Sequence, residues 1–196
     1  MEIRVREDSI EIEGYVNAVE RNSKLLKTRL GSFLERICKG VFERAISKND
    51  IVLLLNHNWD KILAKTSDGT LHLQEDAIGL KARAKIVDPD VVEKAKNGEL
   101  VGWSFGFSNP DEEIVLEDEV QLRRIKDLTL HEVSLLDSRK TPAYEGTLVV
   151  TREEVEMVLA ENLIQDAVVH DLRSMPPEPD YTKYEQMIEE MKKGTR

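Results

Sequence analysis

Ser104 lies in the stretch VGWSFGFS, residues 101–108, whose alternation is typical of a β-strand. Side chains alternate between the two faces of a strand, so the bulky apolar residues fall on one side. The other side carries only Gly102, Ser104, Gly106 and Ser108. Such a bare face lets another backbone pack closely, or it keeps space open around the Ser104 hydroxyl. The pattern leaves both readings open, and the second would let another molecule reach this hydroxyl.

His57 follows a short apolar run, residues 51–55, which predicts a strand buried on both faces. Asn56 and Asn58 flank the histidine, and their amides can hydrogen-bond its ring and fix which nitrogen carries the proton. A structural histidine that is satisfied by its neighbours has the same surroundings. His57 is therefore a candidate for proton transfer or for a purely structural role.

His131 and Glu132 are two ionisable residues in the middle of an apolar strand, residues 128–136. Alternation places Glu132 on the face of Leu130 and Ser134, and His131 on the opposite face. At least one of the two therefore points inward. A carboxylate held among apolar side chains needs a partner, so this strand is a candidate third contributor to a polar site.

Two segments between these strands predict helices. Residues 32–47 carry apolar side chains at helical spacing, although Gly40 weakens that helix or splits it. A second helix is expected after Asp88, which can cap it, with Pro89 in the first turn and Gly98 just past the end. Elsewhere, Asp68-Gly69 predicts a hairpin that joins residues 62–66 to residues 71–73, and residues 114–125 predict a second hairpin.

The composition is that of a soluble globular protein, with 196 residues of which 40% are hydrophobic and 34% charged. A net charge of -10 argues against a nucleic-acid binder. Cys38 is the single cysteine, which excludes an intrachain disulfide, and its place on the apolar side of residues 32–47 favours an inert buried thiol over a nucleophile. No signal peptide and no apolar run of about 18 residues is found, so we expect a cytoplasmic protein without a membrane span. Four scattered histidines make no ligand cluster, and we expect no metal or organic cofactor.

The order of the motifs resembles the prohead maturation proteases of tailed bacteriophages, which are serine peptidases distantly akin to herpesvirus assemblin. The motifs are LLNHNW at 54–59, LHLQEDAIGL at 71–80, GWSFGF at 102–107, LTLHEVSLLD at 128–137 and PAY at 142–144. The resemblance implies an α+β protein with a mostly antiparallel, barrel-like sheet and a few covering helices. It also implies a serine endopeptidase that removes scaffold segments from the major capsid protein, and cleaves itself, inside the assembling procapsid in the bacterial cytoplasm.

By the same resemblance, Ser104 and His57 form the catalytic pair. A serine hydroxyl is a poor nucleophile until a base takes its proton, and a third group then orients that base. Glu132 occupies the glutamate position of the motif, and His131 is the alternative third member because assemblin-like enzymes use a second histidine. Arg139 is the candidate for the oxyanion-hole region, with a solvated loop charge as the competing reading. A GxSxG elbow is absent from the sequence, which speaks against an α/β-hydrolase.

The chain divides by pattern into a protease domain, residues 1–150, and a helical C-terminal segment, residues 151–196. Apolar spacing predicts one helix to about Arg173, and Tyr181 to Lys193 suggest a second beyond a proline-rich break. This segment either completes the protease core or docks on scaffold or capsid protein. We expect a homodimer or higher oligomer. Two rivals stay open: a catalytically silent capsid-assembly protein with the same fold, and a plain β-barrel interaction module.

Overall fold

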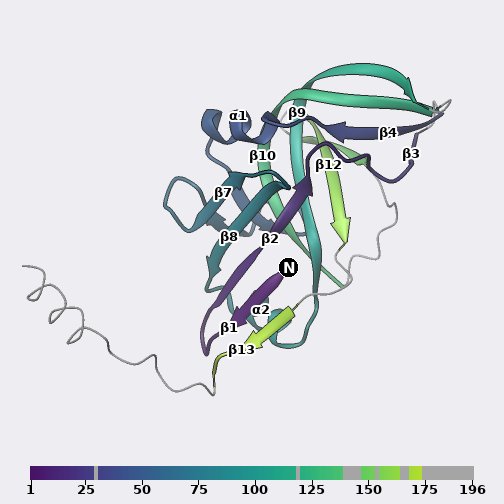
Figure 1. Ribbon diagram of the computed structural model, residues 1–196. Helices are drawn as coiled ribbons and strands as arrows, with labels where there is room; N and C mark the ends of the chain where they lie inside the picture. The colour runs from purple at the N-terminus through teal and green to yellow at the C-terminus, as the bar shows by residue number, and fades with distance from the viewer. Residues whose placement is uncertain (29–30, 118–119, 139–146, 153–154, 164–167, 174–196) are drawn as a thin grey trace, which may run out of the picture.

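The computed structural model describes residues 1–28, 31–117, 120–138, 147–152, 155–163 and 168–173. Two β-sheets pack face to face in these ranges, and two short helices lie against them (Figure 1). Strand pairs are mostly antiparallel, with parallel pairs between β1 and β13 and between β10 and both β4 and β5. The expected α+β class with a mostly antiparallel sheet is therefore confirmed.

The first sheet has the order β13-β1-β2-β8-β7, and the second has β11-β12-β9-β10-β4-β3, with β5 beside β10 and β6 beside β5. The strands of the first sheet are β13 Val168–Asp171, β1 Glu2–Val5, β2 Ile10–Ala18, β8 Gly79–Ile86 and β7 Leu71–Glu75. Those of the second are β11 Thr147–Arg152, β12 Val155–Leu163, β9 Leu100–Glu117, β10 Val120–Asp137, β4 Gly31–Ile37, β3 Leu26–Thr28, β5 Val52–Leu55 and β6 Ile62–Lys65. The described strands do not close into one barrel, because β7 pairs only with β8 and thus leaves an edge.

The core lies between the two sheets and is lined by the bulky face of β9. Trp103, Phe105 and Phe107 are fully buried there, as their alternation predicts. Phe105 meets Phe42 of helix α1 (Val41–Lys48) edge to face at 5.4 Å between ring centroids, and it stacks on Phe107 at 5.5 Å. These aromatic contacts fix which way β9 faces, and so direct its Gly/Ser face away from the core.

The long hairpin of β9 and β10 is the element that positions the candidate residues (Figure 1). The two halves of β10 have different second neighbours: residues 121–125 pair with β4, and residues 132–135 pair with β5. The half beside β5 brings the HEVS motif next to the strand that precedes His57. Helix α2 (Pro89–Lys96) precedes β9 in the chain. Asp88 caps this helix by accepting a hydrogen bond from the Val91 backbone N–H, as predicted.

The expected helix over residues 32–47 is wrong in its first half. Residues 31–37 form strand β4 between β3 and β10, and only residues 41–48 are helical. Gly40 separates the two with a φ of 83°, a conformation that costs glycine little. Strand pairing with β10 overrides the helical spacing here, and it buries the alternate residues Phe33, Glu35 and Ile37.

Two further expectations need correction. Asp68-Gly69 does form a turn, with Gly69 at a φ of 73°, but the turn crosses between sheets, because β6 pairs with β5 and β7 pairs with β8. The predicted helix between residues 151 and 173 is also wrong where the structure describes this segment. Residues 155–163 form β12 on the edge of β9, and residues 168–171 form β13 beside β1. The open edges of β9 and β1 give this segment backbone partners that the spacing of its side chains does not reveal. The second predicted helix, residues 181–193, lies outside the described residues.

Within the ranges that the structure describes, no helix is long and apolar enough to cross a membrane.

Candidate active site

The turn that carries His57 has an unusual backbone. Asn56 and His57 have φ angles of 52° and 60°, in the left-handed region where Asn and His are more tolerated than most residues. Each such residue costs on the order of 1 kcal/mol or more, so surrounding contacts must hold it. The Asn56 backbone N–H donates to the Leu135 carbonyl at 2.8 Å, and the His57 N–H donates to Ser134 Oγ at 3.2 Å. Strand β10 thus fixes the turn.

Glu132 lies just beyond a β-bulge in β10. Leu130 pairs with Phe107 and Glu132 pairs with Gly106, so the register skips His131. The extra residue lets Leu130 pack in the core while Glu132 shares a face with Ser134. Simple alternation placed Leu130 and Glu132 together, and the bulge is the reason that this expectation is wrong.

His57 and Glu132 form a hydrogen bond of 2.8 Å between Nδ1 and Oε1. The side chain of His57 is 7% exposed and that of Glu132 is fully buried. An ionised carboxylate only accepts hydrogen bonds, so it selects the tautomer with the proton on Nδ1 and leaves Nε2 as the basic nitrogen. The second carboxylate oxygen, Oε2, accepts from Ser134 Oγ at 2.5 Å. Both oxygens of this buried group are therefore satisfied within the protein.

Ser104 lies directly opposite Ser134 in the antiparallel pair of β9 and β10. Residues opposed in this way have Cβ atoms about 4.5–5.5 Å apart on the same face. On the β5 side of β10, Leu54 lies opposite Ser134. Leu54 is three residues before His57, so Ser134 lies between the serine strand and the strand that leads to the histidine. The sheet therefore brings the serine, the histidine turn and Glu132 to one face.

The Gly/Ser face of β9 is enclosed in this structure. Ser104 has no exposed surface and Ser108 is 2% exposed. Of the two readings that the sequence left open, this burial disagrees with an open space around the hydroxyl. Residues 158–163 of β12 pair with β9 along this stretch, and Glu161 lies opposite Ser104 in the register. The Ser104 hydroxyl is therefore closed to a peptide in this conformation.

His131 has a different partner from His57. Its Nε2 atom lies 2.6 Å from Ser108 Oγ, and Asn109 Nδ2 donates to the same hydroxyl. Burial lowers the pKa of the His131 imidazole below its usual value, against the opposing effect of the Glu132 charge. Of the two candidate third members, Glu132 is the one that contacts His57.

The side chain of Asn56 also holds the turn against β10. Its Oδ1 atom accepts from the Asp137 backbone N–H at 3.1 Å, and Asn58 Oδ1 accepts from the Asp60 N–H. Both amide oxygens therefore accept from backbone N–H groups. Asp137 ends strand β10, so this strand contacts the turn at Ser134, Leu135 and Asp137.

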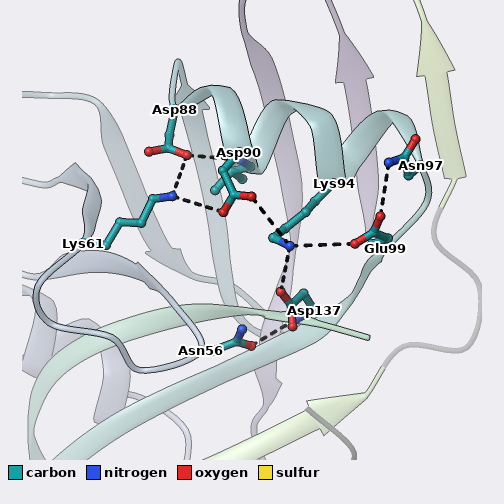
Figure 2. A network of polar contacts seen from close by, with 9 residues as sticks. Asn56, Lys61, Asp88, Asp90, Lys94, Asn97, Glu99 and Asp137 are labelled. Atoms are coloured by element: carbon teal, nitrogen blue, oxygen red, sulfur yellow. Dashed lines mark hydrogen bonds and ion pairs between the residues drawn. The ribbon is translucent and has the colours of Figure 1, made fainter. Parts of the chain in front are cut away.

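A buried ion pair anchors this end of β10 to helix α2 (Figure 2). Lys94 Nζ lies 3.2 Å from Asp137 Oδ2, with side chains only 6% and 1% exposed. Glu99 and Asp90 lie at 3.7 Å and 3.8 Å from the same nitrogen. Lys61 extends the network to Asp88, whose hydrogen bond is the main cause that raises the pKa of the Lys61 ammonium. Sequence reasoning did not identify Lys94, Asp137 or Ser134 as part of this site, although Ser134 shares the HEVS motif with Glu132.

Arg139 lies outside the described residues. Among the residues that the structure does describe, no group of three or more His, Cys, Asp or Glu side chains could hold a metal ion.

The sequence model of the caudovirus prohead serine protease family matches residues 1–161. The chain belongs to this family. The matched region includes Ser104, His57, Glu132 and His131, together with strand β12 up to the residue opposite Ser104. Membership supports a protease of capsid maturation, and it agrees with the resemblance that the motifs indicate. No curated protein and no solved structure matches the chain.

Proposed function

We propose that this prohead protease is a serine endopeptidase whose catalytic residues are Ser104, His57 and Glu132. The observation that carries the proposal is the 2.8 Å hydrogen bond from His57 to the buried Glu132, on the face of the sheet where Ser104 lies opposite Ser134. This arrangement has the elements of a nucleophile, a base and an orienting carboxylate.

In the proposed reaction, Ser104 Oγ attacks the carbonyl carbon of the scissile peptide bond, and its proton passes to His57 Nε2. The C–N bond then breaks as the imidazolium gives that proton to the leaving amine, which leaves an ester on Ser104. A water molecule attacks the ester, gives a proton to His57 and releases the new carboxyl group as Ser104 recovers its proton. Glu132 stabilises the charged imidazolium at both stages and does not itself change protonation.

A developing oxyanion also needs hydrogen-bond donors. Arg139 remains our proposal for that region, since it follows β10 closely in the sequence.

The substrates that we propose are scaffold segments of the major capsid protein, and the chain itself, inside the assembling procapsid in the host cytoplasm. Membership of a prohead protease family supports this assignment. The closed Gly/Ser face fits an enzyme that stays inactive until a partner or a second copy opens it, because Ser104 has no exposed surface. A homodimer or a higher oligomer is the assembly that we expect in the active state.

The decisive experiment is co-expression with the cognate major capsid protein. We expect cleavage with the wild-type chain and none with Ser104→Ala, while association of the two proteins persists. Wild-type protein recovered from the cleaving complex should react with a fluorophosphonate, and mass spectrometry should find the label on Ser104. Cleavage by Ser104→Ala, or a label on another serine in an active preparation, would overturn the assignment.

The burial of Ser104 also favours a second candidate, a catalytically silent assembly protein with the same fold. In that case the wild-type chain and Ser104→Ala associate equally with the capsid protein, neither cleaves it, and no serine takes the label.

A further inference from the structure

Ser134 occupies the middle of the three strands that form the candidate site. It lies opposite Leu54 of β5 on one side and opposite Ser104 of β9 on the other, and it is fully buried. A buried hydroxyl in the middle of a sheet is costly unless its hydrogen-bonding capacity is used. The contacts that Ser134 makes therefore indicate what keeps a polar residue at this position.

The hydroxyl of Ser134 makes two directed hydrogen bonds. Its proton goes to Glu132 Oε2 at 2.5 Å, and its oxygen accepts the backbone N–H of His57 at 3.2 Å. The carboxylate and the histidine that bond each other through Oε1 and Nδ1 are thus also tied to one common atom. This closed set of three hydrogen bonds fixes the distance between the histidine backbone and the carboxylate, as well as the direction of the ring.

The unusual backbone of the His57 turn explains why hydrogen bonds from β10 are needed there. Asn56 and His57 both have positive φ angles, so the turn needs external contacts to persist. The other recorded contacts of the turn with β10 hold Asn56, through the Leu135 carbonyl and the Asp137 N–H. The hydroxyl of Ser134 holds the backbone N–H of His57 itself.

We propose that Ser134 is a positioning residue that sets the geometry of the His57–Glu132 pair and the strength of their interaction. This inference rests on the proposed function of that pair. A donor on Oε2 withdraws negative charge from the carboxylate, which limits how strongly Glu132 favours the protonated imidazole. Without that donor, the imidazole is held less accurately and Glu132 interacts more strongly with its charged form. Misplacement of about 1 Å can lower a rate about a hundredfold.

The test uses the rate of fluorophosphonate reaction at Ser104, measured against pH on the complex in which the wild-type chain cleaves capsid protein. For Ser134→Ala we expect a fall of about ten- to a hundredfold in the limiting rate, by analogy with outer-shell partners of catalytic groups. We also expect the acid limb of the pH profile to move to higher pH. The concentration of reagent for half-maximal rate should change little, because Ser134 does not touch the reagent.

Two further variants separate positioning from a loss of folding. Ser134→Thr keeps the hydroxyl and should restore the wild-type pH limb, with part of the rate. Ile12→Val, in the fully buried core of the other sheet, lowers stability away from the site and should leave both the rate and the limb unchanged.

A wild-type pH limb and rate in folded Ser134→Ala would overturn the proposal while leaving the protease function intact. If Ser134→Ala loses rate only in proportion to its loss of folded protein, and the acid limb of its pH profile does not move, then Ser134 has a structural role only. That result would also overturn the proposal. Failure of the proposed function gives a different result, because the wild-type complex then neither cleaves nor takes label on Ser104.

Discussion

His57 and Glu132 are 75 residues apart in the chain, yet their side chains form a 2.8 Å hydrogen bond that is almost fully shielded from solvent. Its geometry makes Glu132 the group that selects the tautomer of His57. His131, the adjacent residue, bonds Ser108 through Nε2. The two candidates for the third catalytic position thus differ in what each would do when replaced.

We predict that Glu132→Gln lowers the limiting rate of capsid-protein cleavage by about a thousandfold or more. The amide can donate to Nδ1 and so stabilise the wrong tautomer, an effect of about 10⁴ in a comparable triad. The rate with His131→Gln should fall less than about tenfold, since that side chain acts on Ser108. Both are measured by single-turnover cleavage with circular dichroism as the check on folding. A larger loss in His131→Gln than in Glu132→Gln would contradict the assignment.

The Lys94–Asp137 pair predicts a strong effect on stability. Lys94→Met leaves the buried Asp137 carboxylate without its lysine, which should lower the free energy of unfolding by about 3–5 kcal/mol. Lys96→Met on the same helix is the matched control, because Lys96 is more exposed and lies 3.9 Å from the exposed Glu93, and should cost less than about 0.5 kcal/mol.

The double variant Lys94→Met with Asp137→Asn removes both charges and should recover much of the loss in urea unfolding. Equal stability of Lys94→Met and Lys96→Met would show that the buried pair contributes nothing.

Gly79 marks a close approach of β8 to β2. A Cβ atom at this position would lie 2.1 Å from the Asn17 carbonyl oxygen and 2.7 Å from Ala18 Cα, both backbone atoms. Gly79→Ala should therefore lower the free energy of unfolding by about 3 kcal/mol or more, because the strands must separate. Gly98→Ala has open space around it and a φ of 69°, so only the backbone conformation costs it about 1 kcal/mol. Thermal or urea unfolding compares the two, and a smaller loss at Gly79 would be inconsistent with this packing.

Glu35 predicts a dependence of stability on pH. Burial raises the pKa of its carboxyl to about 7, although the Arg123 charge opposes this. The folded protein thus holds this proton more tightly than the unfolded chain, so the stabilisation is complete below about pH 4.5 and is lost as the pH rises through about 7. The loss amounts to at most about 3 kcal/mol.

We expect Glu35→Gln to have little effect on stability near pH 4.5 and to be more stable than the wild type at pH 8, as measured by urea unfolding at both values. Glu117→Gln, an exposed glutamate on the neighbouring hairpin, should show no such divergence. A difference between wild type and Glu35→Gln that is constant with pH would exclude a raised pKa at Glu35.

Local patterns determined much of this protein without tertiary information. The two-residue period of β9 fixed which face carries Trp103 and which carries Ser104, because a strand has no other way to arrange its side chains. The cap at Asp88 and the buried run before His57 were equally local, and each depends on a few adjacent residues. The motif order further indicated the family, which the match over residues 1–161 confirms.

The tertiary structure decided the features that depend on distant partners. Residues 31–37 and 155–163 are strands because they form backbone hydrogen bonds with β10 and β9. The local spacing of their side chains does not reveal these partners. The bulge at His131 is likewise set by pairing with β9, and it separates Glu132 from Leu130 against the alternation rule. The bond between His57 and Glu132, and the hydroxyl of Ser134 that ties them, arise only when β5 lies beside β10. Chemistry-bearing residue types can thus be found in a sequence, whereas their contacts require the strand register, which is a property of the whole sheet.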